Sequence, residues 1–252
     1  MYMNTHLSQI PLLILAVPVV NNLESDGTAS FHFIHGEVEV PVPIGQEEFF
    51  GPPPHLRFLD SIYQGTSDEE ASNIFFGKEL GSSTPEQKYH DLIRLLRPKR
   101  SGRIHSVLDR LNKVMREDGP FDGIIGDSEG AVIAATFIID HFRRSAETNS
   151  QPQLRCAVFI SGGPPYHPDG AGMFLADQCG QIITIPTCHI IGYNDCLIAG
   201  VLALYHLCDE GSASLVDHGR GHRLPRDSRL YQFMIKGIRD LITRTERGPV
   251  VM

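Results

Sequence analysis

The pattern of apolar and polar positions indicates short buried strands that alternate with helices. Short apolar runs end at glycines or small polar turns, as expected for strands that are covered on both faces. After residue 128 the spacing changes, and alanine, valine and isoleucine recur at helical intervals. Strands are predicted to end near residue 125 and to cover 157–160, 188–191 and 213–216, with helices after residue 130 and near residue 197. This order of strand, turn and helix is typical of α/β folds.

An apolar run near the N-terminus, from Ile10 to Val20, is predicted to pack on the core. It lacks a preceding basic stretch and a small-residue cleavage site, and Pro11 and Pro18 interrupt it. These features support neither a signal peptide nor a transmembrane helix, and we expect no membrane association.

The segment FDGIIGDSEGAVIAA, residues 121–135, carries a serine where a strand is followed by a helix. Ser128 lies within Gly-x-Ser-x-Gly, the pattern of a nucleophile elbow. Gly126 and Gly130 leave no side chain where strand and helix cross closely, so the serine can adopt a strained backbone and present its hydroxyl outward. Because the chain contains 24 glycines, the pattern alone also fits an ordinary glycine-rich turn whose serine caps the helix.

An acid follows the elbow in the chain order of α/β-hydrolases, in which the acid and then the histidine each come after a strand. The turn after residues 188–191 presents Asp195, which lies 67 residues beyond Ser128. That spacing leaves room for a helix, a strand and a further segment. The alternative role of Asp195 is to cap the helix that begins near Leu197.

A histidine follows in a glycine-rich loop after the last predicted strand. The loop presents His218 and His222, and His222 lies 27 residues beyond Asp195, which is room for one helix and one strand. We predict that His222 is the general base because of its flanking residues, with His218 as the competitor. Either could instead be a loop histidine that bonds to backbone.

The segments FDGIIGDSEGAVIAA, HIIGYNDCLIAG and HGRGHRLP together resemble the FSH family of serine hydrolases. Its members include the ovarian-cancer-associated gene 2 protein and thioesterases that accompany fungal polyketide synthases. FISGGPP and LESDGTASFHFIHGEVEVPVP resemble two further family segments, so the resemblance covers roughly residues 23–245. It implies an α/β-hydrolase fold, a mostly parallel sheet with helices on both faces, and assigns Ser128, Asp195 and His222 as nucleophile, acid and base.

The family implies an acyl thioester or ester as substrate, either a small molecule or an acyl chain on a carrier, such as a polyketide. The loop after residues 157–160 is predicted to contact this substrate through Gly162, Gly163 and Pro164. A cyclase or other non-hydrolytic enzyme and a non-catalytic binding protein on the same fold are the alternatives.

The chain departs from the family pattern at three places. It opens with MYMNTHLSQIPLLILAV instead of a strand and a Leu-His-Gly-x-Gly loop, so the first strand and the oxyanion loop are expected to be missing or remodelled. The pair His35-Gly36 lies in a segment similar to the second strand and is interpreted as structural. Glu129 stands where Gln is common, and its carboxylate would oppose an oxyanion unless it points away. Its backbone N–H is still the predicted oxyanion donor. Cys196 follows the acid where proline is common.

Composition and charge narrow the function classes. The 252 residues are 41% hydrophobic and 21% charged, which suffices for one sizeable core, and we predict one domain over 1–252. A net charge of −8 argues against nucleic acid as a partner. The basic cluster RLLRPKRSGR, residues 94–103, is interpreted as a solvated helix end and turn. A docking surface for an acidic acyl carrier domain is the alternative.

Cysteines and histidines show no pattern for a disulfide framework or a metal site. The five cysteines include no Cys-x-x-Cys pair. Cys156 and Cys188 fall in predicted strands and are expected to be buried, which fits a reducing, cytoplasmic compartment. His218 and His222 stand four residues apart, but the glycines between them disfavour the helix that such a metal pair needs. No metal and no cofactor are predicted.

Overall fold

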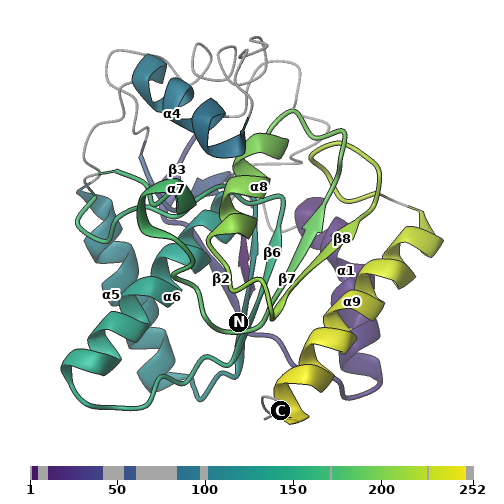
Figure 1. Ribbon diagram of the computed structural model, residues 1–252. Coiled ribbons are helices and arrows are strands. Elements are labelled where there is room, and N and C mark those ends of the chain that lie inside the picture. Colours follow the sequence, from purple (N-terminus) through teal and green to yellow (C-terminus); the bar gives the residue numbers. More distant parts are fainter. Residues whose placement is uncertain are drawn as a thin grey trace.

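The computed structural model describes residues 2–4, 11–41, 54–60, 84–96, 102–170, 172–225 and 227–247. From β5 onward strands and helices alternate along the chain, as the hydrophobic pattern predicted (Figure 1). In chain order the elements are β1 (Tyr2–Asn4), α1 (Pro11–Ser25), β2 (Phe33–His35), β3 (Val38–Glu39), β4 (Leu56–Arg57), α4 (Pro85–Leu96), α5 (Arg103–Glu117), β5 (Gly123–Asp127), α6 (Glu129–Glu147), β6 (Cys156–Ile160), α7 (Ala176–Cys179), β7 (Thr187–Ile191), α8 (Ile198–His206), β8 (Ala213–Asp217) and α9 (Ser228–Arg247).

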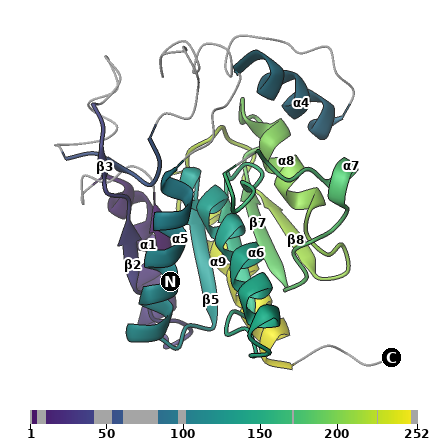
Figure 2. The same ribbon diagram turned by 90° about the vertical axis from the view of Figure 1, so that its left-hand side faces the viewer.

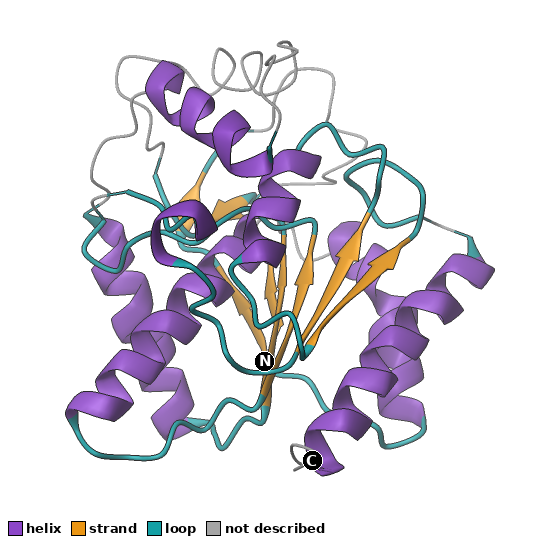
Figure 3. Ribbon diagram, viewed as in Figure 1, coloured by secondary structure: helices purple, strands orange, loops and turns teal. Residues whose placement is uncertain are grey.

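Six strands form one parallel sheet in the order β2-β1-β5-β6-β7-β8. The strand arrows run in one direction between helices on both sides (Figure 3). β3 and β4 form a separate antiparallel pair. The α/β-hydrolase-like fold with a mostly parallel sheet is therefore confirmed. Parallel strands bring their carboxyl ends to one edge, where ligands bind in such sheets.

The first strand, which was expected to be missing or remodelled, is present as β1. β1 lies between β2 and β5, and Met3 is in register with Ile34 on one side and with Gly126 on the other. A short strand is defined by its backbone pairing, so it can form without the family's Leu-His-Gly signature after it. Residues 5–10, where an oxyanion loop would follow, lie outside the described residues.

Each face of the sheet has its own hydrophobic core. Along β6, Ala157 and Phe159 belong to the first core, which is shared with α5 and α6. Val158 and Ile160 belong to the second core, which is shared with α1 and α9. This alternation follows from the two-residue period of a strand. Figure 1 shows α5 and α6 on one side of the sheet and α1 and α9 on the other.

The N-terminal apolar run packs on the core, as predicted. It forms α1, whose residues Val19, Val20 and Leu23 are buried, and α1 packs against α9. No helix in the described part of the chain is long and apolar enough to span a membrane.

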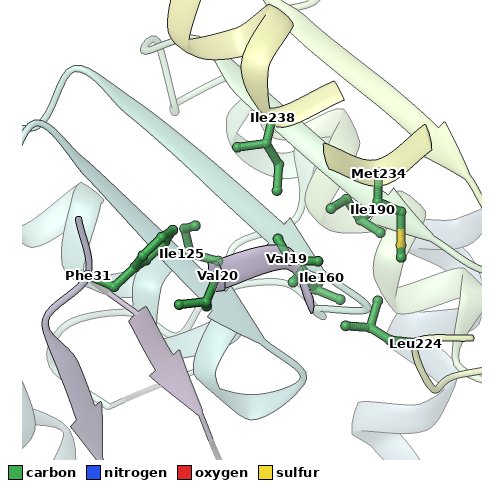
Figure 4. Close-up of a pocket in the computed structure, with 9 residues that line it drawn as sticks. All are labelled: Val19, Val20, Phe31, Ile125, Ile160, Ile190, Leu224, Met234 and Ile238. Carbon is green, nitrogen blue, oxygen red and sulfur yellow. The ribbon is translucent and has the colours of Figure 1, made fainter. Parts of the chain in front are cut away.

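A pocket lies between α1, α9 and the sheet (Figure 4). Its lining is wholly apolar and consists of Val19, Val20, Phe31, Ile125, Ile160, Ile190, Leu224, Met234 and Ile238. A ligand site needs a few polar groups that fix orientation. We therefore assign this pocket to the packing of the second core.

The helix after the elbow extends into a stretch whose composition predicts a loop. Residues 141–155 are polar and contain a proline, which predicts a surface loop, yet α6 continues to Glu147. The polar residues at its end pair along the helix: Arg144 contacts Asp140 at 2.6 Å, and Arg143 contacts Glu147 at 2.6 Å. Pairs at this spacing stabilise a polar helix end that carries no apolar period.

Other expectations fall partly outside the described residues. α4 ends at Leu96 and α5 begins at Arg103, so most of the basic cluster between them is not described. The five cysteines are free, and Cys156 and Cys188 are buried as predicted.

His189 is a titratable side chain inside the first core. It is 1% exposed and lies on β7 between the rings of Phe159 and Tyr205. Its Nε2 contacts the Thr187 hydroxyl at 3.1 Å, and its Nδ1 has no partner among the described residues. Burial lowers the pKa of His189 to about 3. The folded state therefore holds this imidazole neutral.

Acid should destabilise the protein through His189. The unfolded imidazole binds a proton near pH 6.5, whereas the folded one resists it to about pH 3. Neutral His189 contributes fully to the free energy of unfolding above pH 6.5, and this contribution is lost as the pH falls below that value. Between pH 7.5 and pH 5 the free energy of unfolding should fall by about 2 kcal/mol through this group. Urea unfolding at both pH values should show this extra loss in the native chain relative to His189→Gln, which keeps a polar group but does not titrate. An equal loss in both proteins would contradict the prediction.

Candidate active site

Ser128 occupies a sharp turn between β5 and α6. Its backbone has φ 54° and ψ −120°, a positive φ that non-glycine residues rarely adopt. A Cβ at Gly126 would lie 2.4 Å from the carbonyl oxygen of Gly130 and 2.5 Å from the Cα of Ala131. The Ser128 N–H donates to the carbonyl of Ile160 at 2.8 Å. The strained elbow and the close strand–helix approach are confirmed.

The Ser128 hydroxyl contacts the His222 imidazole, which in turn contacts the Asp195 carboxylate. Ser128 Oγ lies 3.1 Å from His222 Nε2, and His222 Nδ1 lies 2.8 Å from Asp195 Oδ2. Asp195 is 3% exposed, and its other oxygen, Oδ1, accepts the N–H of Leu197 at 2.8 Å. The same carboxylate thus contacts the histidine and holds the turn that leads into α8, through the N–H of the N-cap residue Leu197.

The competing histidine is engaged elsewhere. His218 is 3% exposed, its Nδ1 accepts the N–H of Arg220 at 3.3 Å, and its Nε2 is buried without a partner among the described residues. Burial lowers the pKa of His218. Asp217, the nearest alternative acid, accepts the N–H groups of Tyr193 and Gly219. The structure therefore brings His222, and not His218, to Ser128.

The loops that carry the acid and the base are bonded to each other. The Asn194 N–H donates to the Arg220 carbonyl at 3.1 Å, and the Asn194 side chain donates to the Gly219 carbonyl at 3.0 Å. A Cβ at Gly192 would lie 2.2 Å from the Arg220 oxygen, which explains the glycine at this position. These contacts fix Asp195 and His222 relative to one another.

Ser161, at the end of β6, adds a contact that the sequence analysis missed. It also has a positive φ, 47°, and its hydroxyl donates to the backbone carbonyl of His222 at 3.0 Å. Its N–H donates to the Ile190 carbonyl at 3.0 Å. The signal was present in FISGGPP, where a small polar residue ends the strand next to the elbow strand.

Two carboxylates act on the His222 imidazole. Burial alone lowers the pKa of His222, but the hydrogen bond and charge of Asp195 and the charge of Asp127 outweigh it, and the pKa is raised. Asp127 precedes Ser128 and is 8% exposed. Burial raises the pKa of Asp127 to about 6, and the charge of His222 opposes this shift. The negative charges of Asp195 and Asp127 favour an imidazolium, the species that forms when the histidine takes a proton from serine.

Glu129, whose N–H is the predicted oxyanion donor, begins α6. N–H groups in the first turn of a helix have no partner within the helix. Its carboxylate points to the end of β4, where Oε2 accepts the N–H of Phe58 at 3.1 Å and Oε1 lies 3.6 Å from Arg57 Nε. Burial raises the pKa of Glu129, while the charge of Arg57 and the Phe58 N–H oppose the shift. No sequence signal linked Arg57 to the elbow.

The predicted substrate loop lies beside the elbow and the helix α4. Gly162 and Pro164 are buried, and a Cβ at Gly162 would lie 2.3 Å from that of Ala131 on α6. A Cβ at Gly163 would lie 3.0 Å from the hydroxyl of Tyr89 on α4. Figure 2 shows α4 above α8 at the carboxyl edge of the sheet. Contact of these three loop residues with a substrate stays a prediction.

Comparison with known proteins gives several related hydrolases. The chain is 29% identical to "Hydrolase phiM" of Fungal sp. (strain ATCC 74256) over 58% of this chain and 70% of that protein. It is 34% identical to "Esterase FPY3" of Fusarium mangiferae over 51% of this chain and 60% of that protein. It is 28% identical to "Esterase OVCA2" of Xenopus tropicalis over 57% of each chain. The matched part thus spans between 57% and 70% of the length of these relatives.

Among solved structures, the esterase domain of a Rhodothermus marinus protein superposes with a TM-score of 0.40 and 12% identity, over 55% of this chain and 67% of that chain. The model of the family described as "Serine hydrolase (FSH1)" matches residues 29–234, which is most of the chain. The chain therefore belongs to the FSH1 family of serine hydrolases.

Proposed function

We propose that this serine hydrolase cleaves an acyl ester or thioester through a triad of Ser128, His222 and Asp195. The single observation that carries the proposal is the hydrogen-bond chain from the strained Ser128 hydroxyl through His222 to buried Asp195. This geometry matches the roles of nucleophile, base and orienting acid.

The reaction follows from the positions of these atoms. His222 Nε2 accepts the Ser128 proton as the serine oxygen attacks the acyl carbonyl carbon, and a tetrahedral oxyanion forms. The C–O or C–S bond to the leaving group then breaks, and the imidazolium returns the proton to that group. Water, deprotonated by His222, attacks the acyl-serine ester; the bond from the acyl carbon to Ser128 Oγ breaks, the acid is released, and the imidazolium returns its proton to Oγ. Asp195 holds the ring so that Nε2 faces the serine.

The oxyanion is stabilised at the start of α6. The N–H of Glu129 is the proposed donor, and the helix N-terminus adds favourable polarity. Residues 5–10, which follow β1 in the sequence, lie outside the described residues.

The proposed substrate is an acyl chain esterified to a small molecule or to an acyl carrier domain, and a polyketide chain is the preferred case. The family resemblance in the three site motifs supports this choice. The loop of Gly162, Gly163 and Pro164, which adjoins the first turn of α6, would contact the acyl part.

A fluorophosphonate probe tests the proposal, because only an activated serine reacts quickly. We expect rapid labelling of the native chain and, after proteolysis, one modified peptide that contains Ser128. Chain unfolded in urea before addition of the probe is the control and should not label. Labelling at another serine would refute the triad, and the absence of labelling would favour a non-catalytic binding protein.

A further inference from the structure

Glu129, the residue after the nucleophile Ser128, carries a negative charge that should hinder formation of the oxyanion. The N–H of Glu129 is proposed to face the oxyanion, and the carboxylate of a glutamate lies within about 6 Å of its own nitrogen. Two negative charges at such a distance repel, and in a partly buried site water screens them poorly. The chain therefore needs a means to neutralise this carboxylate.

Arg57 supplies the opposite charge. Its Nε lies 3.6 Å from Glu129 Oε1, and the two side chains are only 23% and 17% exposed. The N–H of Phe58 donates to the other oxygen, Oε2, at 3.1 Å. The carboxylate thus lies between a guanidinium and a backbone donor from one short segment.

That segment is paired with β3 and packed into the core. Arg57 pairs with Val38 in the β3–β4 ladder, and the next two residues, Phe58 and Leu59, are each 1% exposed. A Cβ at Gly36, after β2, would lie 2.0 Å from the carbonyl carbon of Arg57. The glycine of the His35-Gly36 pair therefore permits the backbone of Arg57 to lie at this place, in keeping with its structural interpretation.

We propose that Arg57 is a positioning residue for hydrolysis at Ser128: its guanidinium neutralises the Glu129 carboxylate, so that the Glu129 N–H can stabilise the oxyanion. The proposal rests on the proposed function of Ser128. Arg57 does not touch the substrate and acts only through Glu129. Its effect belongs to the transition state, because negative charge develops on the acyl oxygen only there.

A double-mutant cycle tests this role, with kcat and KM measured on p-nitrophenyl acetate. Arg57→Met should lower kcat about ten- to a hundredfold and change KM less than about twofold. When the carboxylate has been removed by Glu129→Gln, adding Arg57→Met should lower kcat less than about twofold, because no charge remains to be neutralised. Arg57→Gln is the second variant, used if Arg57→Met does not fold.

The matched control is Arg110→Met. Arg110 lies near the same segment, 5.9 Å from the Phe58 ring, but its ion pair is with Glu37. Its replacement should leave kcat within about twofold of the native value.

Three outcomes would overturn the proposal. An unchanged kcat for Arg57→Met shows that Arg57 is not needed, and equal losses with and without Glu129→Gln show a structural role unrelated to the charge. In both cases native hydrolysis at Ser128 stands. A native chain that hydrolyses no ester overturns the proposed function, and the role of Arg57 with it.

Discussion

Replacement of Ser128 by alanine should abolish ester hydrolysis and leave the fold intact. The hydroxyl is the only nucleophile in contact with His222 Nε2, at 3.1 Å, among the described residues. Without it no acyl-enzyme forms, and loss of the nucleophile in comparable triads costs on the order of 10⁶-fold in kcat.

Stability should change little because the serine side chain contributes strain and one hydrogen bond rather than packing. Alanine keeps the same backbone at φ 54° and removes a single oxygen. The loss of about 1 kcal/mol from that hydrogen bond corresponds to a fall of about 2–4 °C in melting temperature for a chain of this size. Hydrolysis of a short acyl thioester and a thermal melt by circular dichroism measure both quantities.

Ser161→Ala is the matched control for this experiment. Ser161 also ends a strand with a positive φ, but its hydroxyl contacts only the backbone carbonyl of His222. We expect a loss of less than about tenfold, because one neutral hydrogen bond that positions the base is removed. If Ser128→Ala turns over substrate at the native rate, Ser128 has no part in the mechanism.

The parts of the structure that sequence predicted are those specified by local patterns. β6 is a continuous apolar run, β7 is fully buried and ends in Ile190 and Ile191, and the elbow requires a glycine where Gly126 meets the first turn of α6. Asp195 and His222 could be placed because parallel strands bring the turns after them to one edge of the sheet.

The features that sequence missed depend on contacts between distant segments. Arg57 reaches Glu129 across 72 positions of the chain, and no local pattern marks such a pair. β1 is short and is recognised by its pairing with β2 and β5. The end of α6 lacks an apolar period, so its polar composition resembles that of a loop. It is supported by the ion pairs of Arg144 with Asp140 and of Arg143 with Glu147.

The choice between His222 and His218 also needed three-dimensional information. Both histidines lie in one glycine-rich loop, and both precede or follow glycine. Which histidine faces Ser128 depends on the conformation of this loop, whose Gly219 and Arg220 carbonyls accept hydrogen bonds from Asn194. Closure of the loop aims one ring at Ser128 and buries the other.

Asp195→Asn should lower kcat/KM by roughly 10⁴-fold while the protein stays folded. Oδ1 of Asp195 accepts the Leu197 N–H at 2.8 Å, and an asparagine oxygen can keep this hydrogen bond. The amide nitrogen would then replace Oδ2 and face His222 Nδ1, which lies 2.8 Å away.

That orientation explains the size of the expected loss. An amide N–H donates where the carboxylate accepted, so Nδ1 must be the unprotonated nitrogen and Nε2 must carry the hydrogen. A protonated Nε2 cannot take the proton of Ser128, and the negative charge that stabilises the imidazolium is also gone. Steady-state hydrolysis of a p-nitrophenyl ester at pH 7.5, with a thermal melt of the same samples, measures the effect.

Asp217→Asn is the matched control, since Asp217 is the nearest other acid and its Oδ1 bonds to the backbone N–H groups of Tyr193 and Gly219. Its asparagine can keep an acceptor for these donors, and we expect kcat/KM to fall less than about tenfold. The opposite ranking, with Asp217→Asn the more damaged variant, would mean that Asp217 orients the base in solution. If Asp195→Asn stays within tenfold of the native rate, Asp195 only holds the turn that leads into α8 and the proposed triad is wrong.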